Sequence, residues 1–253
     1  GALEQVLQKN KTEMIYKDIA GFNSSEECSS CISDIVAEGY NALIMIGDYV
    51  TNDIISRHPE VFLEFHNNVF MFDRGMSMMR DWPYSTVSVN LFGEGIMVAE
   101  YLLEQGYEKI VYASFKDEFW VAERLRGLQF GLKRKCGNRV NAEYFKFIRS
   151  ELVKTVPSLV SGDEKTVIVG SNDDYAVEIF DAARANGLVP GTDFGLLGFD
   201  DNVKYRDYNL TTVSPPLEQI GVKLAELVVK KLDGKDHDEV ANFRIGSQIV
   251  PRN

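Results

Sequence analysis

Histidine and cysteine, which commonly build metal and catalytic sites, are scarce in this sequence. It has three of each in 253 residues. The histidines, His58, His66 and His237, stand in three separate loop-like contexts, so no catalytic triad or metal-ligand spacing is evident. Cys28 and Cys31 form a C-x-x-C pair, but no second Cys/His pair lies at the spacing of a zinc site. We therefore expect no metal and no cofactor.

Glycine-rich nucleotide-binding loops are also lacking. Gly93-Glu94-Gly95 begins a helical pattern without the third glycine of a dinucleotide fingerprint, and there is no Walker-type loop. The carboxylate pairs Asp173/Asp174 and Asp200/Asp201 could suggest acid–base chemistry. Adjacent side chains point in different directions, however, so only one of each pair can easily face a common site. We expect that the protein is not an enzyme.

Positive charge is in short supply. Lys and Arg number 27 against 38 Asp and Glu, which gives a net charge of −11 at pH 7. A domain that neutralises the phosphates of DNA or RNA should carry the opposite sign. The chain is therefore not expected to hold nucleic acid by itself.

Long apolar runs are absent too. No run approaches the roughly 18 to 20 residues that cross a bilayer. The first ten residues show no basic segment followed by an apolar core, so no signal peptide is visible. An odd number of cysteines in a long chain does not make a disulfide framework. These features predict a cytoplasmic protein without membrane contact.

Short apolar runs alternate with amphipathic patterns along almost the whole sequence. The predicted strands are Glu13–Ile19, Ala42–Ile46, Val69–Phe72, Thr86–Val89, Lys109–Ala113, Ala142–Phe145, Thr166–Val169 and Phe194–Leu197. The predicted helices are Ser25–Glu38, Gly93–Gln105, Val121–Lys135, Asp173–Asn186 and Leu217–Leu232. This alternation predicts an α/β fold whose parallel sheets are covered on both faces. Because the sequence begins within a helical pattern, Ala2–Gln8, we expect the first strand of the fold to be missing from it.

Polar residues follow several of these strands, at the edge of a parallel sheet where ligands bind. The candidate ligand-binding residues are Asp73, Arg74, Trp120, Arg124, Asn172, Phe199 and Asp200. Carboxylates and an amide bind hydroxyls, arginine offers a fork of donors, and aromatic rings cover C–H faces, so this mixture suits a sugar. Two alternatives stay open: Asn172 or Asp173 can be a helix N-cap, and Asp73-Arg74 can be a surface turn. We expect Asp200→Ala and Arg124→Ala each to abolish binding without disturbing the fold.

Five segments occur in an order and spacing that resemble the effector-binding domain of the lactose-repressor (LacI/GalR) family of transcription regulators. The first is a helix–glycine–strand passage over 99–111, and the second, Glu123-Arg-Leu-Arg-Gly-Leu, resembles the family's R-x-x-G helix start. Ser171-Asn-Asp-Asp-Tyr-Ala resembles N-D-x-x-A. The most specific match is 189–201, which ends in Gly-Phe-Asp-Asp, and the last is Leu210-Thr-Thr-Val with the helix after it.

The resemblance implies two doubly wound parallel-sheet lobes joined by three crossovers, a periplasmic-binding-protein-like fold of type I. The first lobe would be 1–89 plus 214–241 and the second 90–213 plus 242–253. An effector would bind in the cleft between them, lined by Asp73, Arg74, Arg124, Asn172 and Asp200. In such regulators the closure of the lobes is relayed within a homodimer to operator DNA through an N-terminal helix-turn-helix head, which is absent from this sequence.

Two departures from the family pattern affect the expected cleft. Pro215 stands where a glutamine often follows the Thr-Thr strand, and Asn90 replaces a common aspartate. The effector is not identified, because purines as well as sugars bind in this family. The alternative is a sugar-binding protein of an ABC transporter, which shares the fold but works as a monomer. The motifs from Val189 onward favour the regulator.

Overall fold

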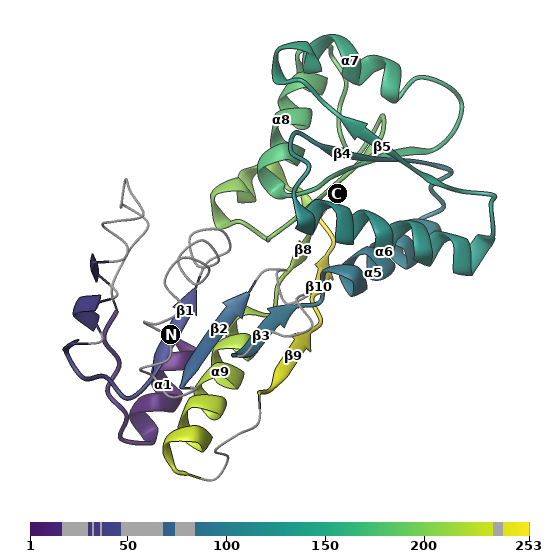
Figure 1. Ribbon diagram of the computed structural model, residues 1–253. Helices are drawn as coiled ribbons and strands as arrows, with labels where there is room; N and C mark the ends of the chain where they lie inside the picture. Colours follow the sequence, from purple (N-terminus) through teal and green to yellow (C-terminus); the bar gives the residue numbers. More distant parts are fainter. Residues whose placement is uncertain are drawn as a thin grey trace. The chain divides into compact units, whose positions relative to one another are not determined.

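The computed structural model forms two compact units (Figure 1). It describes residues 1–16, 30–31, 33–35, 37–46, 68–73, 84–234 and 240–252. The first unit comprises residues 1–89 and 216–245, and the second comprises 90–215 and 246–253. The chain therefore passes from one unit to the other three times, at 89/90, 215/216 and 245/246.

The first unit contains a four-stranded parallel sheet in the order β1-β2-β3-β9. Its elements are α1 (Ala2–Lys9), β1 (Leu43–Ile46), β2 (Val69–Asp73), β3 (Ser85–Val89), α9 (Leu217–Leu232) and β9 (Asn242–Ile245). The strands β2 and β3 are largely buried. Helix α9 packs against both of these strands, and α1 packs against α9.

The second unit contains a six-stranded sheet in the order β10-β8-β7-β6-β4-β5, parallel except for β10. Its strands are β4 (Lys109–Ser114), β5 (Ala142–Lys146), β6 (Thr166–Gly170), β7 (Gly195–Phe199), β8 (Thr211–Ser214) and β10 (Gln248–Val250). Its helices are α5 (Leu91–Glu104), α6 (Phe119–Cys136), α7 (Leu152–Leu159) and α8 (Asp173–Arg184), with short 3-10 turns η1 (Arg149–Glu151) and η2 (Val203–Tyr208).

The four central strands of the second sheet, β8, β7, β6 and β4, are buried on both faces, as in other parallel sheets. In β4, Ile110 and Tyr112 join a core with α5 and α6, whereas Val111 and Ala113 join a second core with α7 and α8. The sheet thus forms the middle of a three-layer unit.

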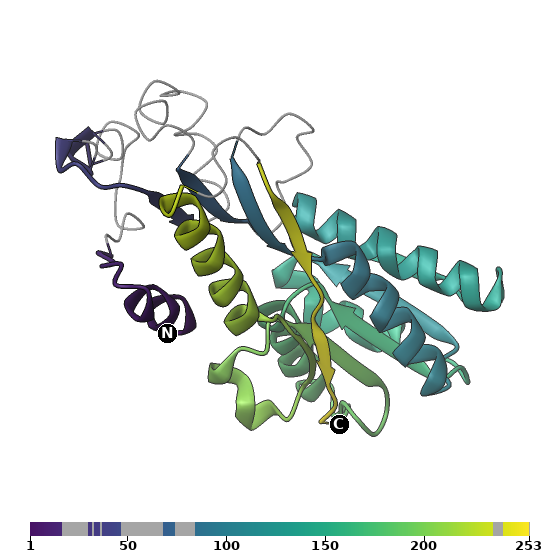
Figure 2. The same cartoon turned by 90° about the horizontal axis from the view of Figure 1, so that it is seen from below.

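Helices α5 and α6 lie side by side along one face of this sheet (Figure 2). Two glycines allow their backbones to touch. A Cβ atom on Gly95 would lie 2.1 Å from the carbonyl oxygen of Arg124, and one on Gly127 would lie 2.1 Å from that of Phe92. This close approach brings the first turn of α5 next to the Arg124 side chain.

The α/β fold is confirmed, and most predicted elements lie within two residues of their expected bounds. The predicted helix Ser25–Glu38 lies partly outside the described residues, and several expectations differ. Residues 13–16 of the predicted first strand form no regular structure, and 17–19 lie outside the described residues. Helix α7 was not predicted, because Pro157 interrupts its pattern. Residues 242–245, which we assigned to the second lobe, form β9 and pair with β3 of the first unit.

Among the described residues, no helix combines the length and the apolar character that a bilayer crossing requires. The same residues contain no group of three or more His, Cys, Asp or Glu side chains placed to hold a metal ion.

Candidate functional site

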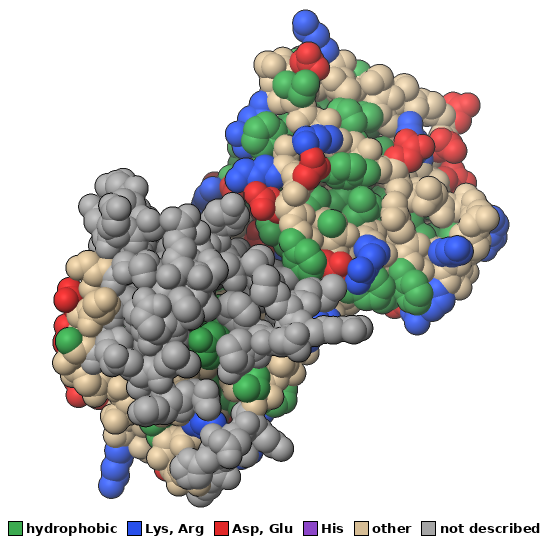
Figure 3. Space-filling model, viewed as in Figure 1, with side chains coloured by type: hydrophobic (Ala, Val, Ile, Leu, Met, Phe, Trp, Pro, Cys, Tyr) green, Lys and Arg blue, Asp and Glu red, His purple; other side chains and the backbone are tan. Residues whose placement is uncertain are grey.

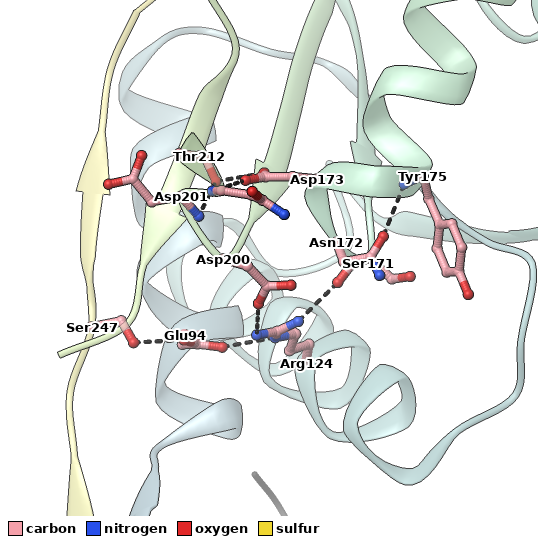
Figure 4. Close-up of polar contacts among 11 residues, drawn as sticks. Glu94, Arg124, Ser171, Asn172, Asp173, Tyr175, Asp200, Asp201, Thr212 and Ser247 are labelled. Carbon is pink, nitrogen blue, oxygen red and sulfur yellow. Dashed lines mark hydrogen bonds and ion pairs between the residues drawn. The ribbon is translucent and has the colours of Figure 1, made fainter. Parts of the chain in front are cut away.

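A buried arginine organises the polar groups at the strand ends of the second unit (Figure 4). Arg124, in α6, donates from Nε to Glu94 Oε2 at 2.7 Å and from Nη1 to the carbonyl oxygen of Ser171 at 2.8 Å. Its Nη2 lies 3.4 Å from Asp200 Oδ1. Ser171 follows β6 and Asp200 follows β7, so α5, α6 and two strand ends meet at one guanidinium.

The guanidinium also packs on aromatic rings. Its central carbon lies 4.2 Å from the ring centre of Phe199 and 5.5 Å from that of Trp120. Burial lowers the pKa of Arg124, but the charges of Glu94 and Asp200 more than offset this effect, so its pKa lies above the usual value. The arginine is therefore a fixed cation, held by carboxylates and by ring faces.

Glu94 is a site residue that the sequence analysis missed. Its side chain is 1% exposed, and its second oxygen, Oε1, accepts from Ser247 Oγ at 2.5 Å. The signal was available: Leu91, Glu94, Val98 and Leu102 form one buried helical stripe, so Glu94 occupies a core position. A carboxylate in such a stripe requires a buried partner.

Asp200 has a strained backbone. Its φ is +103°, in a region that side-chain-bearing residues rarely adopt, and its amide donates to the carbonyl oxygen of Val213 at 2.8 Å. Strain of this kind persists where the surroundings hold it and often accompanies function. The side chain remains 31% exposed, so its carboxylate reaches both Arg124 and solvent.

A second buried carboxylate, that of Asp173, forms hydrogen bonds with the segment that follows Asp200 and with β8. Asp173 accepts from Thr212 Oγ1 at 2.7 Å and from the amide of Asn202 at 2.8 Å. Desolvation raises the pKa of Asp173 to about 6, against these hydrogen bonds, which lower it. A Cβ atom on Gly198 would lie 2.2 Å from Asp173 Oδ1, so the strand must carry glycine there.

Asn172 is the N-cap of α8, because its Oδ1 accepts from the amide of Tyr175 at 2.9 Å. The capping interpretation of this residue is thus confirmed. Asn172 also lines a hollow of about 620 Å³ together with Trp120, Lys116 and Tyr205. The hollow shares Trp120 with the Arg124 cluster, and its lining is largely polar and aromatic.

Among the described residues, one buried side-chain hydroxyl, that of Tyr112, has no hydrogen-bond partner. Tyr112 is fully buried, and within the described part of the chain nothing forms a hydrogen bond with its hydroxyl. Burial raises its pKa, while the charge of Arg124 acts in the opposite direction.

The structure brings five of the seven predicted residues together: Trp120, Arg124, Asn172, Phe199 and Asp200. One of them differs from expectation. We predicted an accessible aromatic face at Phe199, but the ring is 1% exposed and packs against the guanidinium. Asp73 ends β2 of the first unit, and Arg74 lies outside the described residues, as do Cys28 and the three histidines.

Two units of alternating strands and helices, with polar groups at the strand ends, define the class of α/β ligand-binding domains. Within this class, a family described as periplasmic binding protein-like domain matches residues 99–253, more than half of the chain. The chain therefore belongs to the periplasmic binding protein-like domain family.

Curated relatives and solved structures agree with this assignment. The chain is 24% identical over 169 residues to the arabinose metabolism transcriptional repressor of Geobacillus stearothermophilus, covering 63% of this chain and 46% of that protein. It is 32% identical over 157 residues to the probable HTH-type transcriptional regulator EndR of Paenibacillus polymyxa, covering 57% and 45%. A solved complex of the transcriptional regulator CelR with cellobiose superposes with a TM-score of 0.76 at 17% identity, covering 99% of this chain and 76% of that one.

The curated relatives are transcription regulators, and the chain shares its fold with solved LacI-type regulators, in agreement with the resemblance that the five motifs indicated. The chain spans about half the length of the curated relatives that it matches.

Proposed function

We propose that this chain is the ligand-sensing part of a LacI/GalR-type transcription regulator and binds a small polyhydroxylated effector, a sugar, at the Arg124–Asp200 pair. One observation carries the proposal: a guanidinium, two of whose N–H donors have no partner among the described residues, stands beside a partly exposed carboxylate acceptor at the strand ends. A sugar hydroxyl can accept from the first and donate to the second at the same time.

The relatives support both parts of this proposal. The matched curated proteins are transcription regulators, one of them for arabinose metabolism, and the superposed CelR structure contains cellobiose. The regulator is thereby favoured over the alternative of a transporter's sugar-binding protein. The role is non-catalytic, and the cytoplasm is where a regulator would meet its operator.

Effector binding is tested by thermal unfolding in the presence of D-ribose, L-arabinose, D-glucose and cellobiose. A ligand that binds only the folded chain adds about 2.7 kcal/mol at a concentration of 100 times its Kd. We expect at least one of these sugars to stabilise the wild type and Asp200→Asn to lose the effect. Asp207→Asn, which removes an exposed carboxylate of η2, is the matched control. Equal sugar binding by wild type and Asp200→Asn would show that the site is misassigned.

Operator DNA is proposed to bind through a separate N-terminal head in a homodimer. On the face of the second unit that Figure 3 shows, basic and acidic side chains are interspersed and do not form a basic strip. We therefore expect no specific mobility shift of operator DNA by this chain alone. If the regulator is a homodimer, the chain should elute as a dimer in size-exclusion chromatography. A monomer at high protein concentration would favour the transporter protein instead.

A further inference from the structure

The N–H groups of Arg124 differ in how strongly they are hydrogen-bonded within the protein. Of its five N–H groups, Nε–H is given to Glu94 at 2.7 Å and one Nη1–H to Ser171 at 2.8 Å. The Nη2 contact with Asp200 is longer, at 3.4 Å, which is a weak hydrogen bond. Within the described part of the chain, one N–H on Nη1 and at least one on Nη2 have no partner and can donate to a ligand.

The two carboxylates beside this arginine have different accessibility. Glu94 is 1% exposed, and both of its oxygens are occupied, one by Arg124 and the other by Ser247. Asp200 is 31% exposed, and its contact with Arg124 is long, at 3.4 Å. Glu94 therefore orients the arginine without reaching a ligand, whereas Asp200 can exchange Arg124 for a ligand hydroxyl.

Two carboxylates face one guanidinium, so the cluster of Glu94, Arg124 and Asp200 has a formal charge of −1. Among the described residues, no second Lys or Arg side chain pairs with Glu94 or Asp200. The neighbouring carboxylate, Asp201, is already offset by Arg252. Because the cluster is largely buried, its excess negative charge is poorly screened by solvent.

We propose that Glu94 is a specificity-determining residue that makes this site select a neutral, hydroxyl-bearing ligand and reject phosphate esters and carboxylates. A hydroxyl accepts from Arg124 Nη and donates to Asp200, so it satisfies both groups. A phosphate or carboxylate only accepts, and it would face Asp200 as a like charge. Without Glu94 the arginine would be balanced by Asp200 alone, and an anion could replace that carboxylate. The inference rests on the proposed sugar-binding function and narrows its ligand class.

The test is a charge series measured by calorimetry and thermal unfolding. The cluster charge is −1 in the wild type, 0 in Glu94→Gln and in Asp200→Asn, and +1 in the double variant. The probes are inorganic phosphate and the matched pair D-ribose and D-ribose 5-phosphate. Glu100→Gln removes a carboxylate from the same helix, α5, at an exposed pair with Arg134, and so controls for net charge.

We expect wild type and Glu100→Gln to bind neither phosphate nor D-ribose 5-phosphate measurably. Affinity for both should rise by about tenfold or more with each charge removed from the cluster, because a unit charge at this range acts through a low dielectric. Glu94→Asp, which keeps the charge, should reject anions as the wild type does. If Glu94→Gln does not fold, Asp200→Asn tests the same step in charge.

Two results would overturn the inference: anion binding by the wild type at least as tight as that of the neutral sugar, or no gain in anion affinity along the series. Failure of the proposed function is distinguishable. If no neutral sugar binds the wild type while anion affinity still follows the charge series, the charge selectivity stands and the sugar effector is wrong.

Discussion

Replacing Arg124 by methionine should destabilise the fold, contrary to the expectation that the sequence alone suggested. The Arg124–Glu94 pair joins Nε and Oε2 at 2.7 Å between side chains that are 7% and 1% exposed. Methionine retains an apolar stem over Phe199, but it leaves Glu94 buried with Ser247 as its remaining partner. Removing one member of a buried pair costs about 3 to 5 kcal/mol. At about 2 to 4 °C per kcal/mol, the melting temperature should fall by roughly 6 to 20 °C.

A double-mutant cycle separates the stranded charge from lost packing. Glu94→Gln in the Arg124→Met background removes the uncompensated carboxylate, so the double variant should be more stable than Arg124→Met alone. Urea denaturation of all four proteins, followed by circular dichroism, measures this coupling. Arg134→Met breaks an exposed ion pair with Glu100 on the same two helices and should leave stability unchanged. Strict additivity in the cycle, or an Arg124→Met effect no larger than that of Arg134→Met, would refute the reasoning.

Three further predictions concern packing and buried polar groups. Gly127→Ala should cost about 3 kcal/mol in urea denaturation, because its Cβ would lie 2.1 Å from the Phe92 carbonyl oxygen, whereas Gly246→Ala, with open space around it, should be nearly neutral. Tyr112→Phe should leave stability unchanged or raise it by about 1 kcal/mol, since it removes a buried hydroxyl that has no partner within the described residues; a clear loss in thermal unfolding would reveal a partner. The folded-state pKa of Asp173 is raised to about 6, so its stabilising contribution is full below about pH 3.9 and is lost as the pH rises through 6. The stability of Asp173→Asn relative to wild type should therefore increase by up to about 3 kcal/mol between pH 4 and pH 7, and a pH-independent difference would contradict this assignment.

Helices and strands were predicted well where periodicity and end signals within the segment itself define them. Helix α9 has the predicted bounds, Leu217–Leu232, because its apolar stripe is periodic and its ends are marked. Strand pairing is not a local property, and this explains the error at residues 242–245: the apolar character of Phe243 and Ile245 fits either sheet. The five motifs supplied the fold because their order, more than any single residue, carried the information.

The candidate site was predicted in part. The motifs indicated Arg124 and Asp200, but they gave no information on burial, so Phe199 was expected to be accessible. Glu94 was missed although it breaks the apolar stripe of α5. Its partner Ser247 could not have been found, since 153 residues separate the two in the sequence. The positive φ of Asp200 likewise follows from the turn after β7 and leaves no mark on composition.

The three passages of the chain between units have a consequence for synthesis. The first sheet acquires β9 and its covering helix α9 only from residues 217–245, and the second sheet acquires β10 only from residues 248–250. Neither unit is continuous in sequence, so neither can fold to completion while the ribosome is still adding these segments. Ser247, which completes the network of Glu94 and Arg124, is added 153 residues after Glu94. In a nascent chain stopped at residue 215, β3 and β8 would lack the strands that pair with them in the complete sheets, and exposed strand edges of this kind make truncated products targets for chaperones and proteases.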